Sequence, residues 1–94
     1  MAAAIAPNLQ SITLPAPLAL DSGKVLPQVQ VAFETYGELA ADKSNAILIF
    51  HALTGEQFVA STNPLTGKPG WWERMVGPGL PIDTTRIHVI CANI

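Results

Sequence analysis

The sequence has little charge, a single cysteine and no long hydrophobic run. Only 13% of its 94 residues are charged, the formal net charge is -2, and Lys and Arg form no cluster. The chain therefore lacks the basic surface that nucleic-acid binding needs. One cysteine cannot form an intrachain disulfide or a thiolate metal cage, so a metal site is not expected and a reducing compartment is favoured.

Membrane insertion and secretion are also not expected. No apolar segment approaches the roughly 20 residues of a membrane span. The N-terminus has neither the basic region nor the long apolar core of a signal peptide. We therefore predict a cytoplasmic, soluble protein with no nucleic-acid or membrane partner.

The length and apolar content set the domain organisation. Ninety-four residues make one small domain or part of a larger one, and 49% hydrophobic residues are too many for a disordered segment. We predict a flexible N-terminus over residues 1–11 and a single folded unit over 12–94. The last segment, Arg86–Ile94, has the composition of a strand that needs cover on both faces and a neighbour on its far edge. This predicts the N-terminal part of a longer protein; the alternative is a complete, non-catalytic α/β binding module.

The first half of the chain predicts an antiparallel hairpin. Ile12–Leu20 is apolar but interrupted by prolines, which is typical of an edge strand, and residues 21–24 have turn composition. Gln28–Tyr36 alternates, with one apolar face and one polar face, which indicates a half-buried strand. The apolar face contains Val29, Val31 and Phe33, and the polar face contains Gln28, Gln30 and Glu34.

The second half predicts a parallel βαβ unit. Ala46–Phe50 is an unbroken apolar run of strand length, as in a strand buried on both faces. A long connection follows, with a short helix candidate over Gly70–Val76 in which Trp71 and Trp72 are each four residues from an apolar side chain. Arg86–Ile94 returns as the second strand. A right-handed crossover between parallel strands is expected.

The candidate functional site is predicted just after the Ala46–Phe50 strand, in the small, polar segment Ala52–Gly55. Open α/β sheets place their sites outside the carboxyl ends of the strands. A turn at this point can present a backbone N–H as one donor of an oxyanion hole. His51, the last residue before the turn, is interpreted as a structural histidine that bonds nearby backbone, because no Ser or Cys nucleophile is placed beside it by a motif.

The other candidate residues favour structural roles. Trp71 and Trp72 are predicted core anchors, with a substrate-channel wall as the alternative. Cys91 lies mid-strand and is predicted to be a small hydrophobe rather than a nucleophile, while the partner of His88 cannot be inferred. The glycines match neither dinucleotide nor P-loop spacing.

Five blocks, in order and without large gaps, resemble the N-terminal third of homoserine O-acetyltransferases, which are α/β-hydrolase-fold enzymes of methionine biosynthesis. The resemblance runs from about residue 12 to the end. The sequence departs from it after Gly55, where many members carry a histidine near Phe58, and we assign no chemistry to that side chain. The blocks are Phe33–Leu39, Ser44–Gly55, Gly67–Glu73, Val76–Gly79 and Ile82–Asn93.

The resemblance implies an α/β-hydrolase fold and acyl transfer through a serine acyl-enzyme, from acetyl-CoA to the hydroxyl of L-homoserine. It implies that the Leu53 backbone N–H is an oxyanion donor and that Ala52, Thr54 and Gly55 contact substrate. It places the catalytic Ser, Asp and His beyond Ile94, so these 94 residues alone are expected to be inactive. No bound cofactor and a homodimeric full-length protein are further expectations. A homoserine or serine O-succinyltransferase is the nearest alternative, and a plain esterase is another.

Overall fold

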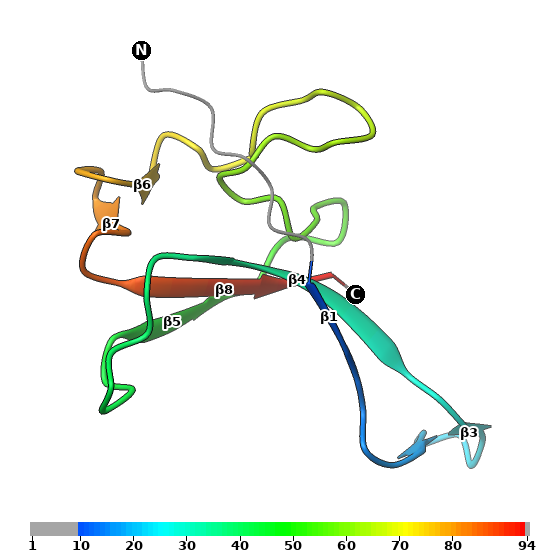
Figure 1. Cartoon of the computed structure of the whole chain (residues 1–94). Helices are drawn as coiled ribbons and strands as arrows, with labels where there is room; N and C mark the ends of the chain where they lie inside the picture. Colours follow the sequence, from blue (N-terminus) through cyan, green and yellow to red (C-terminus); the bar gives the residue numbers. More distant parts are fainter. Residues whose placement is uncertain (1–9, 94) are drawn as a thin grey trace.

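The computed structural model describes residues 10–93 and contains one mixed sheet with long connections on one side of it (Figure 1). The sheet order is β1-β4-β8-β5, formed by β1 (Gln10–Thr13), β4 (Gln30–Tyr36), β8 (His88–Ala92) and β5 (Ala46–Ile49). Residues 1–9 of the predicted flexible N-terminus lie outside the described residues, as does residue 94. The next two residues already belong to β1.

The predicted antiparallel hairpin is confirmed. β1 pairs with β4, and Ile12 lies opposite Val31. The hairpin continues into the short antiparallel pair β2 (Leu18–Ala19) and β3 (Val25–Leu26), which the predicted turn at residues 21–24 connects. The prolines that indicated an edge strand fall between β1 and β2, where no N–H is needed for the ladder.

The predicted assignment of the two faces of β4 is wrong at Glu34, which is 0% exposed although it was placed on the polar face. Tyr36, two residues further and therefore on the same face, is 6% exposed. The reason is tertiary, because the segment that follows β5 folds over this face and bonds to Tyr36. The side that holds Val31 and Phe33 is only half-buried. The alternation was predicted correctly, but the buried face was not.

β8 and β5 are parallel, as predicted, with Ile47 opposite Val89. β8 does not lack a neighbour on its far edge, contrary to expectation, because β4 pairs with it antiparallel on the other side. The strands at the two edges of the sheet are β1 and β5. On β5 two apolar residues differ in exposure. Ile49 is 9% exposed, whereas Leu48 is 54% exposed, so the predicted burial of both faces of this strand is not met within residues 10–93.

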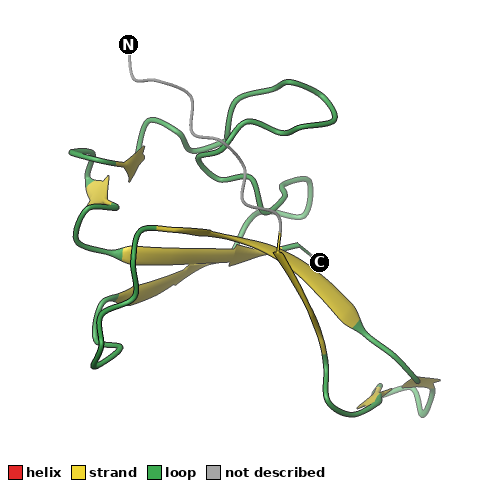
Figure 2. Cartoon of the chain, viewed as in Figure 1, coloured by secondary structure: helices red, strands yellow, loops and turns green. Residues whose placement is uncertain are grey.

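The crossover from β5 to β8 contains no helix within the described part of the chain, so the helix predicted over Gly70–Val76 is wrong (Figure 2). Residues 71–75 form turns, with one four-residue bond from Val76 N–H to Trp72 O. A segment this short depends on tertiary contacts to be helical, and here the Trp71 and Trp72 N–H groups donate to Phe58 O and Val59 O. The parallel pair β6 (Val76–Gly77) and β7 (Ile82–Asp83) follows instead.

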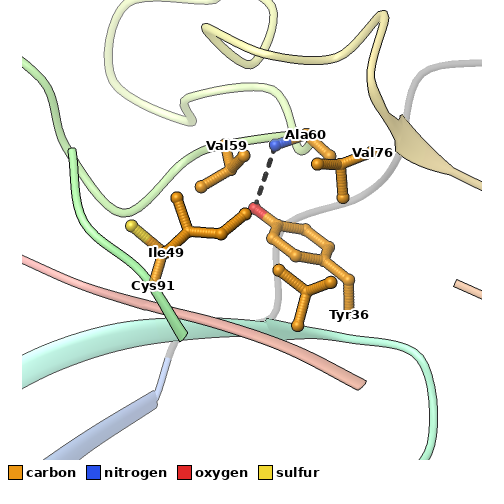
Figure 3. Close-up of a cluster of buried hydrophobic side chains, with 7 residues drawn as sticks. Tyr36, Ile49, Val59, Ala60, Val76 and Cys91 are labelled. Atoms are coloured by element: carbon orange, nitrogen blue, oxygen red, sulfur yellow. Dashed lines mark hydrogen bonds between the residues drawn. The ribbon is translucent and has the colours of Figure 1, made fainter. Parts of the chain in front are cut away.

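The core joins the sheet to the crossover. Tyr36 from β4, Ile49 from β5 and Cys91 from β8 pack with side chains from residues 59–76 (Figure 3). The Tyr36 hydroxyl accepts from Ala60 N–H at 3.3 Å, the dashed line in Figure 3, and lies 2.9 Å from Ser61 Oγ. One buried phenol thus fixes the crossover onto the sheet. No helix within residues 10–93 has the length and hydropathy that a membrane span requires.

The carboxylate of Asp83, the last residue of β7, accepts hydrogen bonds from residues on both sides of it in the chain. Asp83 Oδ1 accepts from Gly79 N–H at 3.1 Å, from Thr85 Oγ1–H at 2.8 Å and from Thr85 N–H at 3.0 Å. These bonds favour the charged form, and the Gly79 N–H bond is the largest cause that holds the pKa of Asp83 below its ordinary value of 3.8.

We expect the Asp83 carboxylate to contribute to the fall in unfolding stability at acidic pH. A lowered folded-state pKa gives stability that is complete above the ordinary value of 3.8 and is lost as pH falls through the folded value. Asp83→Asn should therefore flatten the fall in urea midpoint below about pH 4. Asp21→Asn is the control for loss of one charge, because no hydrogen bond between residues 10 and 93 uses its carboxylate. Identical slopes for the two variants would contradict the expectation.

Candidate active-site loop after β5

The candidate loop leaves the carboxyl end of β5. β5 ends at Ile49, and the chain passes through His51 into Ala52–Gly55. Leu53 is 99% exposed, and the side chains on either side of it are exposed as well. The loop therefore lies where the sequence predicted it, at the end of a strand that pairs in parallel with β8.

Two donors hold the Ala52 carbonyl. Gly55 N–H donates to Ala52 O at 2.7 Å and closes the turn. His51 Nδ1 lies 2.6 Å from the same oxygen, and since a carbonyl oxygen only accepts, Nδ1 carries the proton of this bond. The predicted structural role of His51, a bond to nearby backbone, agrees with this contact.

The fixed carbonyl decides where the Leu53 N–H points. Ala52 C=O and Leu53 N–H belong to one planar, trans peptide group, so they point in opposite directions. With Ala52 O turned toward Gly55 N–H and His51, the Leu53 N–H faces away from the turn. No backbone or side-chain acceptor between residues 10 and 93 takes it. The Leu53 N–H is thus free and its direction is fixed by the bonds to Ala52 O, while the Ala52 and Thr54 N–H groups also have no acceptor between residues 10 and 93.

The chain after the turn is anchored to the crossover. Trp71 Nε1–H donates to Glu56 O at 2.8 Å, and the Trp71 and Trp72 N–H groups donate to Phe58 O and Val59 O. The ring centroids of the two indoles lie 5.8 Å apart with 7° between the ring planes, so the indoles stack on each other. Trp72 packs on the core as predicted, whereas Trp71 is 43% exposed.

The remaining candidates lie away from the turn or are inert. Cys91 is fully buried with its Sγ 3.8 Å from Glu56 O, and burial raises the pKa of its thiol, which disfavours the nucleophilic thiolate. His88 Nδ1 lies 2.9 Å from Gly37 O, a partner that the sequence did not reveal. Sequence reasoning also missed Tyr36, whose place in a Phe-Glu-Thr-Tyr-Gly block was the one available signal. Among residues 10–93, no three His, Cys, Asp or Glu side chains are grouped to hold a metal ion.

Solved structures with the same arrangement define the class of fold. The chain superposes on a homoserine O-acetyltransferase from Bacillus anthracis with a TM-score of 0.82 and 31% identity, over 95% of this chain and 24% of that one. It superposes on an esterase with a TM-score of 0.80 and 33% identity, over 93% of this chain and 24% of that one. These are α/β-hydrolase-fold proteins, and the mixed sheet is consistent with the N-terminal part of that fold.

The sequence comparison gives the family. The chain is 62% identical over 78 residues to the homoserine O-acetyltransferase of Caulobacter vibrioides (strain NA1000 / CB15N), a match that covers 83% of this chain. The resemblance drawn from the five sequence blocks is therefore confirmed: these residues match a segment of the homoserine O-acetyltransferases. The matched segment is 20% of the length of that relative. No family model matches the chain.

Proposed function

We propose that this chain is the oxyanion-loop segment of a homoserine O-acetyltransferase of methionine biosynthesis. The complete enzyme moves an acetyl group from acetyl-CoA to the hydroxyl of L-homoserine. The match to homoserine O-acetyltransferases, at 62% identity in the Caulobacter protein, supports the acetyl donor and the homoserine acceptor. The observation within the chain that carries the proposal is the unused Leu53 N–H at the carboxyl end of β5.

The reaction proceeds through two displacements. The oxygen of a serine outside these residues bonds to the acetyl carbon, the carbon–sulfur bond breaks, and CoA leaves with the proton that the serine gives up. The homoserine oxygen then bonds to the same carbon, the acetyl–serine bond breaks, and the hydroxyl proton of homoserine returns to the serine. Negative charge develops on the acetyl oxygen in both steps, and the Leu53 N–H donates to it. Ala52, Thr54 and Gly55 line the same loop and contact the bound substrate.

Thiol release from CoA tests the donor and the acceptor together. We expect the complete enzyme to release more than one CoA per active site from acetyl-CoA only when homoserine is present, because the acyl-enzyme needs this acceptor to turn over, and to release CoA more slowly from succinyl-CoA. Faster release from succinyl-CoA would make it a succinyltransferase. Replacing homoserine with serine in the same assay tests the acceptor.

A second candidate function is ester hydrolysis, which the 33% identity to an esterase of the same fold favours. The same loop would then stabilise the same acyl oxygen, with water in place of homoserine as the second nucleophile. Acetate release that does not depend on homoserine would identify this activity.

A further inference from the structure

The side chain of His51 bonds to the peptide group between Ala52 and Leu53. Its Nδ1–H donates to Ala52 O at 2.6 Å, while Gly55 N–H reaches the same oxygen from the other end of the turn at 2.7 Å. The ring is half-buried, and its Nε2 is buried with no hydrogen-bond partner between residues 10 and 93. The ring therefore has one polar contact in the described chain, and that contact is to the peptide group that carries the Leu53 N–H.

The backbone is shaped to admit this ring. A Cβ on Gly55 would lie 2.8 Å from His51 Cβ and 3.2 Å from Ala52 O, so only glycine lets the turn close against the histidine. The turn, the glycine and the ring thus form one unit, in which rotation of the Ala52–Leu53 peptide would break both bonds to Ala52 O. Without the ring, the Gly55 N–H bond alone holds an exposed peptide that water can compete for.

We propose that His51 is a positioning residue that fixes the direction of the Leu53 N–H by holding the Ala52 carbonyl. The inference rests on the proposed function, because it assigns the Leu53 N–H to the acyl oxygen. It gives the histidine no proton to transfer in the reaction. What it supplies is preorganisation, which lets an oxyanion donor act without reorienting during the reaction.

Two substitutions of similar shape distinguish the effect of losing the hydrogen-bond donor from the effect of losing the imidazole ring. In His51→Asn the side-chain amide nitrogen can occupy the place of Nδ1 and donate to Ala52 O, whereas in His51→Leu a methyl group occupies it. We expect His51→Leu to lower kcat about 10- to 100-fold, less than the roughly 100- to 1000-fold loss of a whole donor. His51→Asn should stay within about threefold of wild type because the bond is restored. KM for homoserine should change little in either variant.

A double-mutant cycle measures whether the effect of His51→Leu on kcat depends on the Leu53 N–H. A histidine that only stabilised the fold would have the same effect with or without that N–H. Leu53→Pro removes the N–H itself, so His51→Leu should lower kcat little further in a Leu53→Pro background. Equal losses in the asparagine and leucine variants, or full additivity with Leu53→Pro, would overturn the inference. Unfolding midpoints of all variants are measured alongside, so that kcat is compared among folded enzymes.

The same variants are assayed for hydrolysis of p-nitrophenyl acetate, which needs an oxyanion donor but no homoserine. A wild-type enzyme that hydrolyses this ester without acetylating homoserine would refute the proposed acceptor, while the ratio of the two His51 variants would still decide the role of the ring. Acetyl transfer that is unaffected by His51→Leu would refute the positioning role alone. A wild-type enzyme inactive in both assays would overturn both proposals.

Discussion

Replacing Leu53 with proline is expected to lower kcat for acetyl transfer about 100- to 1000-fold, because proline has no N–H to donate to the acyl oxygen. The loop can accept the ring. Leu53 does not have a positive φ, since Lys43 is the one non-glycine residue within 10–93 that does. No hydrogen bond within those residues is lost, because the Leu53 N–H makes none there. The effect should therefore appear in turnover more than in stability.

Leu53→Ala is the matched comparison, since it removes a side chain that is 99% exposed in this chain and keeps the amide. The ratio of the two variants measures the N–H, and we expect Leu53→Pro to be at least tenfold slower than Leu53→Ala. Rates of acyl-enzyme formation, followed as the first burst of CoA release, locate the loss in the chemical step. Equal rates for the proline and alanine variants would remove Leu53 from the oxyanion hole.

The sequence predicts local patterns well in this chain. Alternation identified β4, an unbroken apolar run identified β5, and interrupting prolines placed the first strand at an edge. Those signals arise from residues that are close together in the sequence, so they can be recognised without knowledge of the tertiary structure. The position of the candidate loop followed from the same logic, because the change from Phe50 to His51 marks the end of an apolar run.

The errors arise where a distant segment decides the outcome. Glu34 was assigned to the polar face of the alternating strand, yet the segment around Val59 covers its face of β4. The predicted helix had plausible apolar spacing, but Trp71 and Trp72 use their N–H groups to pair with residues 58 and 59, and Gly70 packs directly on Ala60. Spacing within a segment cannot reveal which remote carbonyl will accept its N–H groups.

The same distinction applies to the candidate site. The strand–loop pattern located the candidate loop, and the resemblance to homoserine O-acetyltransferases pointed to Leu53 within it, but the direction of the Leu53 N–H depends on the bonds to Ala52 O. A histidine that ends a strand is compatible with many partners, so the bond of His51 to the following carbonyl was foreseen only as a general contact with nearby backbone. The direction in which a backbone N–H points can be determined only from the three-dimensional structure.

Alanine at Gly37 is expected to destabilise the protein by about 2–5 kcal/mol, from two combined causes. Gly37 has a φ of +77°, a left-handed conformation that costs other residues about 1–2 kcal/mol. A Cβ there would also collide with Ile87 O and lie 2.6 Å from Thr84 O, and both are backbone atoms that cannot rotate away. Overpacking of this kind costs about 1–3 kcal/mol. Urea unfolding of the complete protein measures the loss.

Gly23→Ala separates the two causes, because Gly23 has a similar φ of +88° and no atom within 4 Å of the added Cβ. It should cost only about 1–2 kcal/mol. The additional loss of unfolding free energy in Gly37→Ala then measures the steric crowding against the segment before β8. Gly37 follows Tyr36 directly and its carbonyl receives His88 Nδ1–H at 2.9 Å, so a shift there disturbs both the core phenol and the β4–β8 junction. Equal losses at the two glycines would mean that this close approach relaxes without cost.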